Sequence, residues 1–200
     1  MVPLAEASVD SKFEAFISNL VKALRGVVFA CILLCVTVSC YILLLWGRFY
    51  SLISTKKQLS QRSHAVASLW GQLIFKLMPG WDAEISGAEY LKPIREGQAR
   101  VIVVNHQSNA DIMPLYFLDI PFCWLAKDIL FKLPMVGQAM RWAGYVAVKR
   151  HDKFSREQAV HQCQQLLCSG TSVVFFPEGT RSVDGNIKDF KLGAFRLARE

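Results

Sequence analysis

The sequence is poor in charge and has no organised cysteine pattern. Charged residues make up 20% of the chain and apolar residues 52%, whereas an ordinary soluble protein has about 25% charged residues. The six cysteines include no C-x-x-C pair and no spacing typical of metal ligands, so we expect reduced thiols, no disulfide framework and no metal site. Internal repeats and low-complexity tracts are also absent, which argues against a repeat protein.

The shortage of charge is concentrated in one stretch. Residues 26–47 carry no charged side chain, and Arg25 and Arg48 bracket them. About 22 residues at about 1.5 Å each span roughly 33 Å, enough to cross a bilayer core. A secretory signal peptide fits poorly, because the run is too long and no small-x-small cleavage site follows closely. We therefore expect a transmembrane anchor here, with a buried core helix as the alternative.

The positive charge of the chain lies after this stretch. Acidic and basic residues balance before residue 26, so the net charge of +7 comes from the part that follows. Such a basic domain is attracted to anionic lipid headgroups and to phosphorylated substrates. The basic residues form no run and no recognition motif, so a nucleic acid is not an expected partner. Flanking charge slightly favours a cytoplasmic location for the C-terminal part, with Lys12, Lys22 and Arg25 before the stretch and Arg48, Lys56, Lys57 and Arg62 after it.

These features divide the chain into four segments. Residues 1–25 have the apolar spacing of an amphipathic helix lying near a surface, and the anchor occupies 26–47. Residues 48–80 combine a polar, helix-compatible stretch with an apolar run too short to span a bilayer alone, so we expect a membrane-interfacial helical segment ended by Pro79-Gly80. Residues 81–200 form the remaining domain.

The domain at 81–200 alternates predicted strands with predicted helices. This alternation predicts an α/β fold with a mixed, mostly parallel sheet flanked by helices. The expected strands are Ala83–Ser86, Val101–Val104, Phe122–Leu125, Tyr145–Val148 and Thr171–Phe176. The expected helices are Ile112–Leu118, Leu130–Trp142, Phe154–Leu167 and one that begins near Lys191. Binding sites in such folds lie where strand ends lead into loops.

A histidine and an aspartate follow the strand expected at Val101–Val104. His106 and Asp111 are five residues apart, so on one helix they would lie roughly 140° apart, and on one strand they would face opposite sides. They can meet only if the chain turns between them. An imidazole oriented by a carboxylate is the arrangement of a general base that activates a hydroxyl. The alternative is that Asp111, Ser108 or Asn109 caps a helix and that His106 is an ordinary loop residue.

A second polar motif, F-P-E-G-T-R-S, follows the strand expected at Thr171–Phe176. Its proline and glycine suit a tight turn, and Arg181 offers a planar fork that matches phosphate oxygens. Lys127 and Arg150 follow two other expected strands, so both could converge on the same edge of the sheet. Each motif alone could be an ordinary turn with solvated side chains.

Taken together, the motifs resemble those of the 1-acyl-glycerol-3-phosphate acyltransferase family of glycerolipid acyltransferases. The block N-H-x-S-x-x-D matches at residues 105–111, and F-P-E-G-T-R-S is complete at 176–182. The segment K-x-x-L-x-x-x-P-x-x-G matches at Lys127, Leu130, Pro134 and Gly137. The block G-x-x-F-x-x-R matches only at Gly144 and Arg150, because Ala147 replaces the usual aromatic residue. The resemblance covers residues 90–200, and such an ordered set is specific.

The resemblance implies transfer of a fatty acyl group from acyl-CoA or acyl-carrier protein to the sn-2 hydroxyl of lysophosphatidate, giving phosphatidate. His106 and Asp111 are the implied catalytic residues, with backbone N–H groups near Ala110 as candidate oxyanion donors. Glu178 would hydrogen-bond glycerol or fix Arg181. The implied substrate-binding residues are Ser108, Lys127, Arg150, Glu178, Gly179, Thr180 and Arg181. No cofactor and no metal are implied, and the absence of G-x-S-x-G agrees with direct attack by the acceptor.

The expected partners are membrane lipids and the two substrates, and the expected location is the endoplasmic reticulum membrane of a eukaryote or the inner membrane of a bacterium, with the catalytic domain on the cytoplasmic side. Alternatives are another acceptor such as glycerol 3-phosphate or a lysophospholipid, an acyl-thioester hydrolase, or an inactive membrane-anchored interaction module. In the family a fourth block follows the helix that begins near Lys191, so the resemblance leads us to expect a C-terminally incomplete domain.

Overall fold

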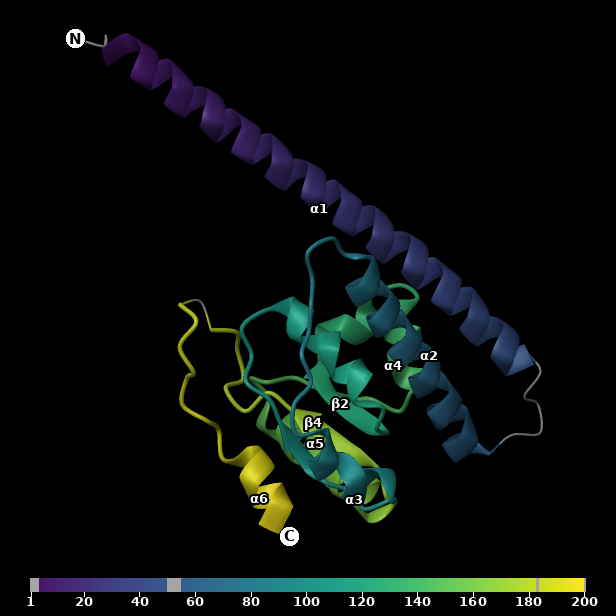
Figure 1. The fold of residues 1–200 in the computed structure, drawn as a ribbon. Coiled ribbons are helices and arrows are strands. Elements are labelled where there is room, and N and C mark those ends of the chain that lie inside the picture. Colours follow the sequence, from purple (N-terminus) through teal and green to yellow (C-terminus); the bar gives the residue numbers. More distant parts are fainter. Residues whose placement is uncertain (1–3, 50–54, 183, 200) are drawn as a thin grey trace.

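The first helix runs through both of the N-terminal segments expected from the sequence. The computed structural model describes residues 4–49, 55–182 and 184–199. Helix α1 (Leu4–Phe49) is continuous, and its N-terminal half extends away from the rest of the molecule (Figure 1). Its stretch Phe13–Phe49 has a mean hydropathy of 2.8 over its most apolar window, of which 17% is buried. By length and composition alone, this helix could cross a membrane.

Helix α2 (Lys56–Leu77) packs alongside the C-terminal half of α1. A capping box starts it: Thr55 Oγ1 accepts from the Gln58 N–H at 3.3 Å, and Gln58 Oε1 accepts from the Thr55 N–H at 3.0 Å. The helix ends just before Pro79-Gly80. Trp70 Nε1 donates to Thr37 Oγ1 on α1 at 2.9 Å, and a small apolar core of the two helices surrounds this bond.

Four parallel strands form the sheet, which confirms the α/β expectation. They are β1 (Val101–Val103), β2 (Phe122–Lys127), β3 (Val146–Val148) and β4 (Ser172–Phe175), in the order β1-β4-β2-β3. All three strand pairs are parallel. The carboxyl ends of the strands therefore meet at one edge, where the polar motifs begin.

One strand prediction was wrong. Residues 83–86 have no regular secondary structure. This segment follows α2 and runs along the surface of the molecule, where Ile85 is 45% exposed. Its alternating apolar residues therefore pack against no apolar face that would stabilise a strand.

The helices follow the predicted positions, with two departures. The helix expected at 112–118 is replaced by two 3-10 turns, which meet at Met113. A 3-10 turn η4 (Asp128–Lys132) and helix α4 (Val136–Trp142) replace the single helix expected at 130–142. Pro134 explains the break, because proline has no N–H and disfavours helical geometry in the residue before it. The remaining elements are η1 (Ala88–Leu91), α3 (Lys92–Arg95), η2 (Asn109–Ile112), η3 (Pro114–Leu118), α5 (Lys153–Cys168) and α6 (Gly193–Arg199).

The two faces of the sheet carry different layers and different cavities. Successive residues of a strand point to opposite faces. Trp124 of β2 lines an apolar cavity of about 220 Å³ beside α1, α2 and α4. The next residue, Leu125, lines a second cavity of about 600 Å³ beside α5 and α6. Both cavities adjoin the sheet and extend to different sides of it.

A buried polar network joins α2 to the sheet. His64 Nε2 lies 3.3 Å from the carbonyl oxygen of Ile120, and Nδ1 lies 3.0 Å from the hydroxyl of Tyr145. Because a carbonyl only accepts, Nε2 donates, and in the neutral ring Nδ1 accepts from Tyr145. The Tyr145 hydroxyl lies 3.2 Å from that of Tyr116, which accepts from Trp124 Nε1 at 3.0 Å. The network thus fixes the tautomer of His64.

We expect this network to make stability depend on pH. Burial lowers the pKa of His64 from its ordinary value of 6.5. The unfolded chain therefore binds more protons than the folded chain as the pH falls below 6.5, so the stabilisation present above that pH is lost as the pH falls through the folded-state pKa. Chemical unfolding at about pH 7.5 and about pH 5.5 measures this difference.

The matched variants are His64→Gln and, as a control at an exposed position, His151→Gln. His64→Gln is expected to flatten the decline in unfolding free energy between the two pH values, whereas His151→Gln keeps the decline of the unmodified protein. An equal decline in all three proteins would contradict the assignment to His64.

Candidate active site

The chain turns between His106 and Asp111, and the two side chains meet. His106 lies beyond the end of β1, and Asp111 lies in the single turn of η2. His106 Nδ1 is 3.0 Å from Asp111 Oδ2, and the two side chains are 12% and 27% exposed. The pair is thus partly shielded from water but open to a ligand.

Asp111 is held in place by the loop that it caps. Its Oδ2 also accepts from the backbone N–H groups of Gln107 at 2.7 Å and of Ser108 at 2.8 Å. Asp111 Oδ2 therefore does both things that the sequence allowed: it caps the η2 turn and it orients the His106 ring. Since a carboxylate oxygen only accepts, His106 Nδ1 carries the proton in the neutral ring, and Nε2 presents a lone pair.

The expected oxyanion donor near Ala110 is already engaged. The Ala110 N–H donates to Ser108 Oγ at 3.1 Å, and the Asp111 N–H donates to the Ser108 carbonyl at 3.3 Å. These contacts stabilise the η2 turn. Ser108 therefore acts in the structure as the cap of η2, and the Ala110 N–H is not directed at a substrate oxygen.

An aromatic platform supports the imidazole ring of His106. The ring stacks on Phe176 with centroids 4.0 Å apart and planes 20° apart. Trp124 stacks on the same Phe176 ring, with centroids 5.4 Å apart. Tyr116 holds Trp124 through the indole N–H. The platform joins the buried polar network around His64 to the His106 ring.

Glu178 joins the two polar motifs through backbone contacts. Its side chain is buried, with the residue 4% exposed. Oε1 accepts from the His106 N–H at 2.7 Å, and Oε2 accepts from the Lys188 N–H at 3.2 Å. The Ser182 N–H donates in turn to the His106 carbonyl at 2.8 Å. The sequence suggested contact with glycerol or Arg181, but the carboxylate instead fixes the backbone of the His106 loop.

The predicted basic residues are only partly brought together. Arg150 donates from Nη1 to the carbonyl oxygen of Gly179, and both residues line the larger cavity. Gly179 has a φ of +73°, a conformation that L side chains rarely adopt, and an added Cβ there would lie 2.6 Å from Lys191 Nζ. Arg181 and Thr180 are exposed on the loop after β4, and Lys127 is exposed at the end of β2. Among the residues that the structure describes, none of these three forms a hydrogen bond or an ion pair with His106 or Asp111.

Several residues near the pair were not predicted from the sequence. No sequence signal singled out Trp124 or Tyr116, and the function of Phe176 as a platform depends on strand pairing. Arg156, on α5, donates to the Arg150 carbonyl at 2.8 Å. In the sequence, Arg156 follows the expected strand at 145–148 by only eight residues, and this spacing could have indicated that it lies near Arg150.

A sequence profile of the Acyltransferase family matches residues 82–200. The chain belongs to this family. The matched range contains His106, Asp111 and the whole F-P-E-G-T-R-S motif, whereas α1 and α2 lie outside it.

Named relatives agree with this family membership, and a solved structure has the same fold. The chloroplastic 1-acyl-sn-glycerol-3-phosphate acyltransferase of Arabidopsis thaliana is 35% identical over 96% of this chain, and a 1-acyl-sn-glycerol-3-phosphate acyltransferase of Chlamydomonas reinhardtii is 39% identical over 68%. This chain spans 52% and 40% of their lengths. The crystal structure of the 1-acyl-sn-glycerophosphate acyltransferase PlsC from Thermotoga maritima has the same fold, with a TM-score of 0.72 at 24% identity, over 90% of this chain and 70% of that one.

Proposed function

We propose that this acyltransferase moves a fatty acyl group from an acyl thioester to the sn-2 hydroxyl of 1-acyl-glycerol-3-phosphate, giving phosphatidate. The observation that carries the proposal is the free Nε2 lone pair of His106, set by the bond from Nδ1 to Asp111. The names of the Arabidopsis and Chlamydomonas relatives support the choice of acceptor.

The proposed chemistry needs no covalent enzyme intermediate. His106 Nε2 takes the proton of the acceptor hydroxyl as the oxygen attacks the thioester carbonyl. The tetrahedral intermediate collapses to the ester, the carbon–sulfur bond breaks, and the leaving thiolate takes the proton from the imidazolium. Asp111 stabilises the imidazolium through Nδ1. Hydroxyl plus thioester thus give ester plus thiol.

Basic residues at the same edge of the sheet would bind the acceptor phosphate. Arg181 is exposed within the motif, and its backbone carbonyl accepts from the Lys188 ammonium at 2.9 Å. Lys127 ends β2, which neighbours β3, and Arg150 lies two residues beyond β3. We assign phosphate binding to these three cations, with Thr180 and the Gly179 backbone beside them.

The apolar cavity supplies a place for an acyl chain. Its walls come from α1, α2, α4 and β2, and the residues include Cys40, Trp70, Met140 and Trp124. A chain of methylenes gains about 0.8 kcal/mol for each CH₂ buried there. Because α1 and α2 form part of the wall, a substrate could enter directly from a lipid phase.

We further assign membrane association to the N-terminal helices. The proposed division is a surface segment at 1–25, an anchor at 26–47, an interfacial segment at 48–80 and the catalytic domain at 81–200. In this arrangement the domain lies on the cytoplasmic side of the endoplasmic reticulum membrane or of a bacterial inner membrane. The exposure of Leu34, Ile42 and Trp46 on α1 supports contact with lipid.

A transfer assay with the whole chain in lipid vesicles tests the function. Labelled acyl-CoA or acyl-carrier protein is supplied with lysophosphatidate, glycerol 3-phosphate or lysophosphatidylcholine, and the lipid products are separated. The expected product is labelled phosphatidate, formed only with lysophosphatidate. Free fatty acid without acceptor dependence would indicate a hydrolase, and no product with any acceptor would support an interaction module.

A further inference from the structure

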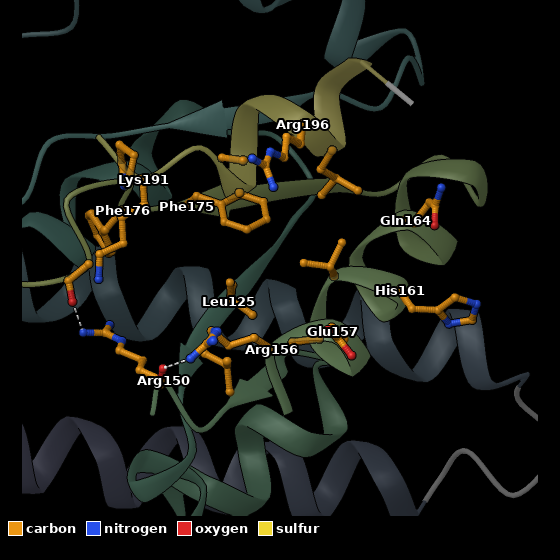
Figure 2. A pocket seen from close by; sticks show the side chains of 18 residues that line it. Leu125, Arg150, Arg156, Glu157, His161, Gln164, Phe175, Phe176, Lys191 and Arg196 are labelled. Atoms are coloured by element: carbon orange, nitrogen blue, oxygen red, sulfur yellow. Dashed lines mark hydrogen bonds between the residues drawn. The ribbon is translucent and has the colours of Figure 1, made fainter. Parts of the chain in front are cut away.

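The larger cavity lies beside the proposed reaction centre but on the other face of the sheet. It is bounded by α5, α6 and the loop after β4, and its volume is about 600 Å³ (Figure 2). Phe176 and Gly179 line one end of this cavity. This end lies near His106, since the His106 ring stacks on Phe176. On α5 the lining runs from Arg156 to Gln164, eight residues apart, or about 12 Å along the helix. The cavity therefore leads away from the reaction centre.

Its lining is strongly positive. Arg150, Arg156, Lys191 and Arg196 bring four cations, against the single carboxylate of Glu157. Glu157 pairs with Lys153 at 3.9 Å on the exposed side of α5, so it does not neutralise them.

Two of these cations have no protein counterion. In the ranges that the structure describes, the side chains of Lys191 and Arg196 make no hydrogen bond and no ion pair within the protein. Figure 2 shows Arg196 on α6 beside Phe175, whereas Arg156 on α5 points to the carbonyl of Arg150. Cations that face a cavity without a counterion are complementary to an anionic ligand.

The volume of this cavity and the apolar part of its wall suit a ligand larger than a lone phosphate ion. Ligand cavities of about 300–1,000 Å³ hold whole drug-sized molecules. Between the cations the wall is apolar, with Leu125, Val148 and Leu197. The matching ligand is an organic chain that carries phosphate at a distance from its reactive end.

Only one of the two proposed substrates has that shape. In lysophosphatidate the phosphate lies one carbon beyond the reacting hydroxyl, so it must stay near His106. In the acyl donor the phosphate lies at the far end of the pantetheine arm from the thioester sulfur. We propose that this cavity binds the phosphorylated pantetheine arm of the acyl donor, with Arg196 on its phosphate. This inference rests on the proposed acyl transfer.

In this arrangement the two halves of the donor lie on opposite faces of the sheet. The acyl chain lies in the apolar cavity next to Trp124, and the phosphorylated arm lies next to Leu125. The thioester then crosses the carboxyl edge of the sheet beside Phe176, where the His106 ring is stacked. The same arm occurs in coenzyme A and on acyl-carrier protein, and kinetics with both donors separates these sources.

Kinetics of Arg196→Gln with both donors tests the assignment. The KM for the donor in use is expected to rise about tenfold, as for loss of a charge-assisted hydrogen bond at an exposed site, while the KM for lysophosphatidate stays unchanged. Arg196→Lys is expected to restore part of the loss. The matched control is Arg199→Gln, which removes a charge from the same helix outside the cavity.

Free 4′-phosphopantetheine and pantetheine complete the test as inhibitors. The phosphorylated compound is expected to compete with the donor, about tenfold better than pantetheine, and Arg196→Gln should remove this difference. Equal inhibition by both compounds, or a raised KM for lysophosphatidate alone, would overturn the inference. If the whole chain transfers no acyl group, the proposed function fails instead. Calorimetry of 4′-phosphopantetheine with the unmodified chain and Arg196→Gln then decides the cavity separately: weaker binding by the variant supports the inference, and equal binding or none overturns it.

Discussion

Replacing His106 with alanine is expected to lower kcat for acyl transfer about 10²–10⁴-fold, the usual contribution of a positioned general base. The donor KM should change little, because the cavities that hold the chain and the arm are lined by other residues. Initial rates of labelled phosphatidate formation from vesicles measure both constants. The alanine leaves the Glu178 contact intact, since that contact uses the backbone N–H of residue 106.

Two further variants make this result specific. Asp111→Asn keeps an oxygen that can accept from Nδ1 but removes the charge that stabilises the imidazolium, so a smaller loss, roughly tenfold to a hundredfold, is expected. His151→Ala, at an exposed position away from the pair, should retain full activity. Full activity in His106→Ala would refute the mechanism.

The sequence predicted the His106–Asp111 contact because both residues belong to one short loop. Separation, strand end and side-chain chemistry together required a turn, and the turn is present. The parallel α/β sheet was predictable for the same reason, since each apolar run followed by a helix is a local signal. Local sequence therefore specified the pair and the layers of the domain.

Contacts that depend on strand pairing were beyond the sequence. Glu178 reaches the His106 N–H only because β1 and β4 are neighbours in register, with Val103 opposite Phe175. The same pairing places Phe176 under the imidazole. A strand order of β1-β4-β2-β3 brings together residues about 70 positions apart, and no local pattern encodes that order.

The sequence also did not show that residues 4–49 form one continuous helix, for a different reason. The change from an amphipathic to an apolar pattern near Gly26 suggested two segments. A single glycine costs a helix only about 1 kcal/mol relative to alanine, and no proline lies between residues 4 and 49. The change of composition therefore did not mark a helix end.

Replacing Gly137 with alanine is expected to destabilise the domain by about 3 kcal/mol or more, the upper range for inserting atoms into a packed site. An added Cβ would overlap the carbonyl group of Phe131 and lie 2.9 Å from its Cα. Phe131 cannot easily move, because its carbonyl accepts from Arg141 at 2.5 Å and its side chain is buried. Chemical unfolding of purified protein in detergent measures the loss.

The matched control is Gly26→Ala, the same change in a helix where nothing lies within 4 Å of the added atom. There we expect no loss, because alanine is the better helix former. Met135 and Met140 flank the Gly137 position on the apolar cavity, so a displaced α4 should also shift the preferred acyl-chain length of Gly137→Ala. Unfolding curves that coincide for Gly137→Ala and the unmodified protein would show that α4 and η4 pack less closely than described, and the cavity wall assigned to the acyl chain would then be misplaced.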